Sequence, residues 1–161
     1  FQDPSSSFDP RRTLGQSVTE GLRNAGTPKG EALERAGELF ERCGLARELL
    51  GRYPHQVSGG QCQRAALARA LAARPALLIA DEATSALDVT VQAQVVALLR
   101  ELNAEFGMAV LFICHDLALV QDFCDRVAVM REGRIVEVGP TERVLSSPSD
   151  PYTASLIASA L

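Results

Sequence analysis

Apolar residues near the start of the chain recur at helical spacing. Between residues 31 and 44 they fall at steps of three and four, which places them on one stripe of a helix that Gly44 can end. The residues of this stripe are Leu33, Ala36, Leu39, Phe40 and Cys43. A shorter segment over residues 13–25 follows the same spacing. We therefore predict a Ser-, Asp- and Pro-rich opening loop and a small helical subdomain over residues 1–56.

From residue 57 to residue 145, short apolar runs alternate with helical segments. The runs 76–80 and 108–113 are apolar without interruption, which is typical of strands buried inside a parallel sheet. Between them, Asp88 can cap a long helix and Gly107 can end it. This alternation predicts the α/β class, with helices on a mostly parallel sheet.

Two further features complete the predicted architecture. A helix is expected over residues 117–123, and Glu132-Gly133 can join the two strands that follow it as a hairpin. The tail, residues 146–161, combines a turn rich in Ser and Pro with a short helix, which we interpret as a packing helix.

Composition and charge narrow the possible functions. The chain is 47% hydrophobic, enough for a real core, and its net charge of −4 leaves no basic surface for nucleic acid. No apolar run reaches the roughly 18 residues of a membrane span and no signal peptide opens the chain, so we expect it to be soluble. The four cysteines lack metal-ligand spacing and are expected to be free thiols in a reducing compartment.

Two carboxylates follow the first apolar run directly. Asp81 and Glu82 would lie at the carboxyl end of a parallel strand, where open α/β sheets bind ligands. Asp81 could hold Mg²⁺, usually through water, and Glu82 could accept a proton from an attacking water. The alternative is a pair of acids that only cap the next helix.

His115 comes directly after the second apolar run, so we expect it at the same edge of the sheet. A hydrogen-bonding side chain there could contact a terminal phosphate or orient the attacking water. Taken alone, His115-Asp116 favours an ordinary surface pair, and it is the presence of two strand-end sites in one sheet that shifts the balance toward a binding role.

A Ser-Gly-Gly-Gln segment precedes an Ala- and Arg-rich helix. Ser58 is a good cap, and Gly59 and Gly60 allow backbone N–H groups to approach an anion closely. Gln61 completes the segment. The alternative is a linker, but the acid pair about 20 residues later favours a binding role.

Together these segments resemble the nucleotide-binding subunits of ABC transporters. The resemblance covers the whole chain and rests on five motifs in order. The Q-loop is resembled by Phe1-Gln2-Asp3-Pro4, and the signature by Val57-Ser58-Gly59-Gly60-Gln61. The Walker B strand is resembled by Leu77-Leu78-Ile79-Ala80-Asp81-Glu82, and the D-loop by Ser85-Ala86-Leu87-Asp88. His115 resembles the switch histidine. This resemblance implies part of a P-loop NTPase (RecA-like) fold.

Within that family, the chain most resembles the importer ATPases for oligopeptides, dipeptides and nickel. The similarity rests on the segments 1–11 and 84–94 and on the tail Asp150-Pro151-Tyr152-Thr153. Three residues depart from the usual pattern: Ala83 replaces a Pro, Cys62 an Arg and Cys114 a Ser. Cys62 is a candidate for an oxidisable thiol near the nucleotide.

The resemblance also implies roles and partners. Two ATPase subunits, identical or different, would form a head-to-tail dimer in which Gly59 and Gly60 serve the partner's ATP. Asp81, Glu82 and His115 would serve the chain's own ATP and Mg²⁺. Gln2 would reach the metal and the attacking water, with Ser58, Gly59, Gly60, Gln61 and Asp88 as further cofactor-binding residues. The expected partners are transmembrane permease subunits at the cytoplasmic face of a bacterial inner membrane and, indirectly, a solute-binding protein.

One family motif does not occur in these residues. The phosphate loop needs Gly-Lys followed by Ser or Thr, but the only lysine, Lys29, is preceded by Pro28. We expect a C-terminal fragment of a transport ATPase that does not hydrolyse ATP alone, because the phosphates lack their main anchor. Two alternatives remain: a soluble ABC ATPase acting on DNA or ribosomes, and a regulatory protein that retains the fold.

Overall fold

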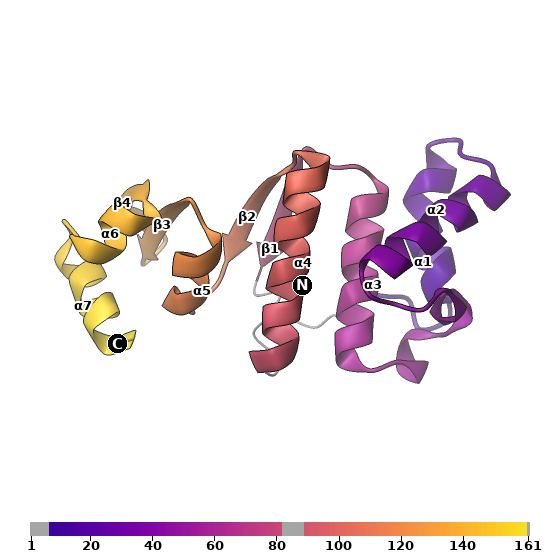
Figure 1. Cartoon of the computed structure of the whole chain (residues 1–161), viewed down its shortest axis with the longest axis horizontal. Coiled ribbons are helices and arrows are strands. Elements are labelled where there is room, and N and C mark those ends of the chain that lie inside the picture. Colours follow the sequence, from indigo (N-terminus) through magenta and orange to yellow (C-terminus); the bar gives the residue numbers. More distant parts are fainter. Residues whose placement is uncertain (1–6, 82–88, 161) are drawn as a thin grey trace. The chain divides into compact units, whose positions relative to one another are not determined.

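The computed structural model describes residues 7–81 and 89–160, and it divides the chain into two compact units. The first unit ends at Ile113 and the second begins at Cys114. Figure 1 shows the helices and strands of each unit, which are described separately below.

The first unit contains helices followed by a strand–helix–strand segment. Its elements are α1 (Leu14–Asn24), α2 (Lys29–Arg42), η1 (Arg47–Gly51), η2 (Pro54–Gln56), α3 (Gly59–Ala72), β1 (Leu77–Asp81), α4 (Val89–Phe106) and β2 (Ala109–Ile113). The second unit contains α5 (Leu117–Phe123), β3 (Arg126–Arg131), β4 (Arg134–Pro140), α6 (Thr141–Ser146) and α7 (Pro151–Ala160). No described helix is long and apolar enough to cross a bilayer.

The first two helices pack against α3 and against each other. Leu14 and Val18 of α1 and Phe40 of α2 are completely buried. Thr13 caps α1 in a capping box with Gln16, in which each side chain bonds the other residue's backbone N–H. The predicted helical region therefore owes its stability to apolar burial on the α3 side and to a satisfied helix start.

The predicted apolar stripe of α2 is wrong at one position. Leu33 is 48% exposed, whereas Ala32 and Gly37 are buried beside the expected Ala36 and Phe40. Small residues on this face allow close approach, because a Cβ on Gly37 would lie only 2.9 Å from the guanidinium carbon of Arg47. The buried face is thus rotated toward small side chains, which leaves the larger Leu33 at its margin.

The expected parallel pairing is confirmed. Strands β1 and β2 run in parallel, from Leu77 opposite Ala109 to Asp81 opposite Ile113. One face is covered, since Leu78 is buried and borders the same apolar pocket as Val95 of α4. On the other face four apolar side chains are about half exposed, namely Leu77, Ile79, Leu111 and Ile113. Burial on both faces, as predicted, is therefore wrong for the part of the chain that the structure describes.

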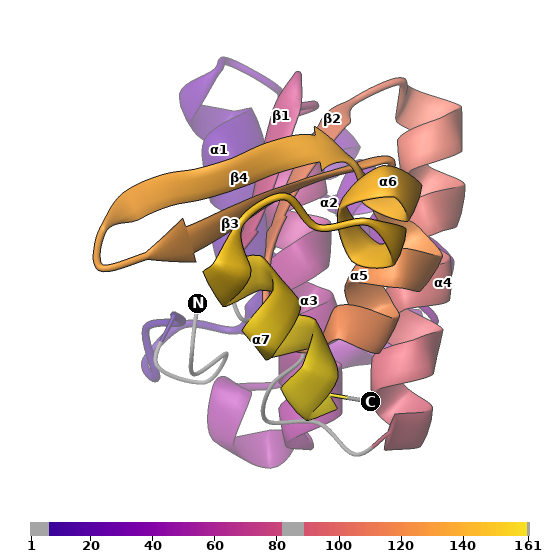
Figure 2. The ribbon, with the colours of Figure 1, turned by 90° about the vertical axis from the view of Figure 1, so that its left-hand side faces the viewer.

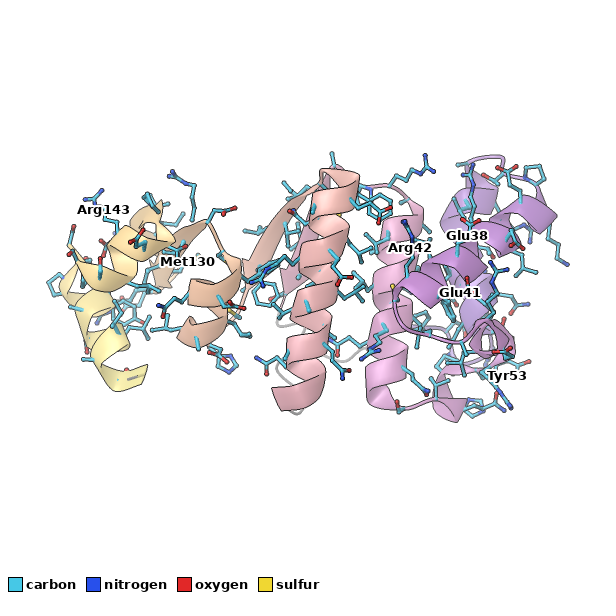
Figure 3. The ribbon with its side chains drawn as sticks, in the orientation of Figure 1. Glu38, Glu41, Arg42, Tyr53, Met130 and Arg143 are labelled. Atoms are coloured by element: carbon cyan, nitrogen blue, oxygen red, sulfur yellow. The ribbon has the colours of Figure 1, made fainter. Side chains whose placement is uncertain are left out.

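A single arginine also joins the predicted helical region to α4. Arg42, marked in Figure 3, forms an ion pair with Glu105, and its guanidinium lies 5.4 Å from the ring centre of Phe106. A cation over an aromatic ring adds electrostatic attraction to the ion pair. The end of α2 is thereby fixed to the end of α4.

The hairpin of the second unit has the turn that its sequence predicts. Strands β3 and β4 pair antiparallel, with Arg131 opposite Arg134. Glu132 and Gly133 have φ angles of 51° and 76°. Positive φ at both central residues characterises a type I′ turn, whose twist matches that of the strands. The predicted hairpin is confirmed.

A carboxylate on β4 holds the start of the C-terminal helix α7, whose ribbon can be followed in Figure 2. Glu137 accepts hydrogen bonds from the backbone N–H groups of Ser149 at 2.8 Å and Asp150 at 3.1 Å. Asp150 in turn accepts from the N–H of Tyr152, whose ring lies 4.8 Å from the guanidinium of Arg131. The predicted packing helix is confirmed, and Asp150-Pro151-Tyr152-Thr153 is the segment that docks it.

Acid should loosen this docking. The hydrogen bond from Ser149, with help from Asp150, lowers the pKa of Glu137 below its ordinary 4.5. Because the pKa of Glu137 is lower in the folded state, the ionised carboxylate stabilises the fold fully at a pH above its ordinary pKa. This stabilisation is lost as the pH falls through the folded-state pKa. We expect the methyl resonance of the buried Thr153 to move toward its exposed position over that range. In Glu137→Gln this acid transition should be absent, and an unchanged transition would assign the effect to other carboxylates.

Candidate functional site

The start of α3 is an exposed helix N-terminus that is closed by a capping box. Ser58 Oγ accepts from the N–H of Gln61 at 3.2 Å, and Gln61 Oε1 accepts from the N–H of Ser58 at 2.9 Å. This capping box fixes the first turn without using the N–H groups of Gly59 and Gly60. The expected helix start at Ser58 is therefore confirmed, while Gln61 acts here as a capping partner.

Gly59 leaves room in front of this helix start. Gly59 is exposed, and a Cβ built on it would meet no heavy atom of the described residues within 4 Å. The fold itself therefore does not require glycine at this position. Two N–H groups at the positive end of a helix form an arrangement that can receive a phosphate or another anion.

Asp81 lies where the sequence predicted the metal-binding carboxylate. It is exposed and ends β1 opposite Ile113 of β2, at the carboxyl edge of the parallel pair. Mg²⁺ commonly takes one or two protein carboxylates and keeps several waters, so a single exposed carboxylate suits such a role. No cluster of three or more His, Cys, Asp or Glu side chains that could hold a metal occurs among residues 7–81 and 89–160.

Three other predicted residues lie outside the described residues. These are Gln2, Glu82 and Asp88. Their roles as metal contact, general base and D-loop residue therefore stay predictions.

His115 lies two residues beyond the end of β2, at the start of the second unit. Its side chain is exposed, as a residue that meets a ligand or a partner must be. The neighbouring Asp116 caps α5, since its Oδ1 accepts from the N–H groups of Ala118 at 2.9 Å and Leu119 at 3.3 Å. Asp116 thus has a structural role that accounts for it, whereas the structure assigns none to His115.

The cysteines do not form a reactive site. The four cysteines, all of them described, form no disulfide, and Cys62 is only 1% exposed, which argues against the oxidisable thiol expected at the start of α3. Burial raises the pKa of Cys43 to about 12 and also raises the pKa of Cys114 and Cys124. A raised pKa keeps a thiol protonated at neutral pH, and the protonated form is a poor nucleophile.

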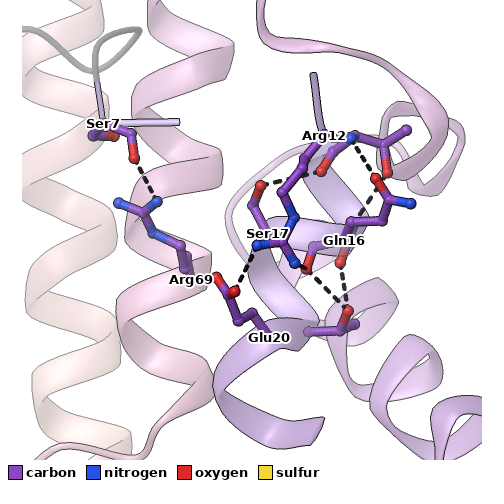
Figure 4. A network of polar contacts seen from close by, with 9 residues as sticks. Ser7, Arg12, Gln16, Ser17, Glu20 and Arg69 are labelled. Carbon is purple, nitrogen blue, oxygen red and sulfur yellow. Dashed lines mark hydrogen bonds and ion pairs between the residues drawn. The ribbon is translucent and has the colours of Figure 1, made fainter. Parts of the chain in front are cut away.

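Sequence reasoning missed one residue further along the same helix. Arg69 of α3 donates to the carbonyl oxygen of Ser7 at 2.7 Å (Figure 4). Its guanidinium also lies 4.5 Å from the ring centre of Phe8. Helical spacing shows which residues share a face of α3, but not which distant segment crosses that face. The aromatic Phe8, which follows the Q-loop-like Gln2 by six positions in the sequence, is the signal that could have drawn attention to this contact.

Comparison with known proteins decides the family. The model of the ABC transporter family matches residues 1–85, more than half of the 161 residues. The chain belongs to this family. Its α/β class is therefore that of the P-loop NTPase core of ABC ATPases.

Relatives of this chain in the ABC transporter family are named as import proteins. The glutathione import ATP-binding protein GsiA of Escherichia coli strain K12 is 52% identical over 159 residues, which is 98% of this chain and 26% of that protein. GsiA of Salmonella choleraesuis has the same identity and coverage. The chain thus spans about a quarter of the length of these relatives.

A solved ABC transporter structure shares the fold. CbiO1 from Clostridium perfringens, described as part of the ABC transporter complex cbiONQ, has a TM-score of 0.81 and 33% identity. The match covers 91% of this chain and 58% of that chain.

The open space at Gly59 has a consequence for folding. Gly59→Ala should leave the melting temperature unchanged or slightly higher, because nothing stands in the way of the new methyl group. Gly15→Ala is the contrasting variant, since its Cβ would lie 2.8 Å from the carbonyl oxygen of Leu50. We expect it to lose roughly 1–3 kcal/mol of stability through this overlap. Equal losses in thermal unfolding would show that Gly59 is needed for folding after all.

Proposed function

We propose that this chain is part of an ATP-hydrolysing subunit that powers ABC-type import of peptides or similar small solutes. The observation that carries the proposal is the capped, exposed start of α3, with Gly59 open to solvent. The import names of relatives that are 52% identical support the transport role. The alternative of an ABC ATPase acting on DNA or ribosomes finds no support among these relatives.

The start of α3 would bind ATP held by a second ATPase subunit, identical or different. The N–H groups of Gly59 and Gly60 can donate to the terminal phosphate, and the positive end of the helix adds attraction for its charge. The capping box prepares this geometry in advance, because it holds Ser58 and Gln61 before any ligand arrives. Binding would therefore cost little ordering of the protein.

Hydrolysis of the subunit's own ATP would use the edge at the end of β1. Mg²⁺, when bound, offsets charge on the phosphates and helps to orient them. Asp81 would hold it, with Gln2 as the second contact. Glu82 would take the proton of the attacking water, and His115 would orient that water or contact the terminal phosphate.

The expected partners follow from the transport role. The complete subunit would work at the cytoplasmic face of a bacterial inner membrane, bound to transmembrane permease subunits. A separate solute-binding protein would deliver the solute to those permeases. The description of CbiO1 as part of an ABC transporter complex supports an assembly of this kind.

Replacement of the proposed base should separate binding from hydrolysis. In the complete subunit, Glu82→Gln should lower kcat by on the order of 10² to 10⁴, the usual contribution of a general base. The Kd for Mg-ATP should change little, because the amide keeps the size of the carboxylate. Steady-state hydrolysis and calorimetric titration measure the two effects. Normal turnover in the variant would place the base elsewhere.

The signature role predicts a defect in assembly rather than in nucleotide affinity. Gly59→Gln would place a side chain in the space that a partner's phosphate must enter, so ATP-driven dimerisation should fall at least about tenfold. The matched control is Gly21→Gln on α1, where a side chain also meets open space. Light scattering in the Glu82→Gln background measures the dimer. A normal dimer in Gly59→Gln would exclude this binding mode.

A further inference from the structure

One side chain of α3 holds the loop that follows the Q-loop-like segment. Arg69 Nη1 donates to the carbonyl oxygen of Ser7 at 2.7 Å, and the Arg69 guanidinium lies 4.5 Å from the ring centre of Phe8. Phe8 is 4% exposed, so the ring that receives this cation is fixed by burial. A planar guanidinium can bond a carbonyl and cover an aromatic face at once, which an ammonium does less well.

The chain after Phe8 is anchored separately to α1. The N–H of Arg12 donates to the carbonyl of Asp9 at 3.1 Å, and Thr13 begins α1 with its capping box. Arg12 then forms an ion pair with Glu20 at 2.5 Å (Figure 4). The loop is therefore held on one side by α1 and on the other by Arg69 of α3.

The electrostatic surroundings favour a directed contact. Burial lowers the pKa of Arg69, while the nearby Cys62 and the carboxylate of Glu20 oppose that shift. A partly desolvated guanidinium depends more strongly on each partner it keeps, since water replaces them poorly. Two of the contacts that Arg69 makes are with the loop, at the Ser7 carbonyl and the Phe8 ring.

The same helix carries the proposed phosphate-binding start. Arg69 lies ten residues after Gly59, which corresponds to about 15 Å along a continuous α-helix. The helix starts with a complete capping box and presents buried Ala65 and Ala68 to its neighbours. A displacement of the loop at Ser7 would therefore act on a rigid element whose first residues are Gly59 and Gly60.

We propose that Arg69 is a positioning residue that couples the loop after Gln2 to the start of α3. This inference rests on the proposed function. Through Arg69, the loop after Gln2, which would approach the subunit's own ATP, moves together with the start of α3, which would receive the partner's ATP. Arg69 acts through the Ser7 carbonyl and the Phe8 ring and does not contact the nucleotide. The coupling ensures that the helix start is placed for the partner only when the loop is placed for ATP.

The test compares two ATP titrations within one molecule. In the complete subunit with Glu82→Gln, hydrogen exchange is followed at increasing Mg-ATP in the segment ending at Arg12 and in the first two turns of α3. In this parent the two segments should become protected at the same ATP concentration. In Arg69→Met, which keeps the side-chain length, the midpoint for α3 should rise at least about fivefold above that of the loop, a typical coupling factor.

Two further variants separate coupling from packing. Arg42→Met removes a guanidinium of α2 that likewise lies over an aromatic ring, that of Phe106, and pairs with Glu105 of α4, and its two midpoints should stay together. Phe8→Leu keeps an apolar side chain in the buried position but removes the ring face, so it should separate the midpoints as Arg69→Met does. If Arg69→Met does not fold, Phe8→Leu alone tests whether the contact between Arg69 and Phe8 couples the two segments.

The outcomes distinguish this inference from the proposed function. Coincident midpoints in both Arg69→Met and Phe8→Leu, with normal protection by ATP, would overturn the role of Arg69 and leave the ATPase proposal intact. No protection by Mg-ATP in either segment of the parent would overturn both.

Discussion

The structure of the first unit depends on close packing against α3. The buried positions of this helix are mostly small, with Cys62, Ala65 and Ala68 at 1% exposure or less, so other segments can approach its axis. Close contact multiplies dispersion attraction and excludes water over the whole face. The same helix has the exposed Gly59 at its start and Arg69 near its end. The packing that fixes the position of α3 therefore also fixes the position of the proposed phosphate-binding N–H groups.

Local signals predicted the elements whose causes are local. The helix over residues 117–123 was correct to the residue, and so was the turn at Glu132-Gly133, because caps and turns depend on neighbours in sequence. The parallel pair could also be predicted, since two uninterrupted apolar runs joined by a helix have few alternatives. The start of α3 at Ser58 belongs to the same group, as the spacing of Ser58 and Gln61 defines a capping box.

Features that depend on distant segments could not be predicted. The exposure of Leu33 reflects which neighbours approach α2, and the burial of Cys62 reflects what lies over α3. The contact of Arg69 with Ser7 joins residues that are 62 positions apart. Periodicity identifies an apolar face, but tertiary contacts decide how wide that face is and what covers it.

The half-covered sheet implies an alternating tolerance to substitution along β1. Leu78 is 9% exposed and Ile79 is 58% exposed, although both are aliphatic residues of one strand. As the chain stands, a polar replacement at Ile79 removes little apolar burial, whereas one at Leu78 places a polar group in the interior. The loss of stability caused by polar substitutions should therefore alternate from one residue of β1 to the next. If substitutions at both residues were equally harmful in a larger assembly, the exposed face of the sheet would be buried in that assembly.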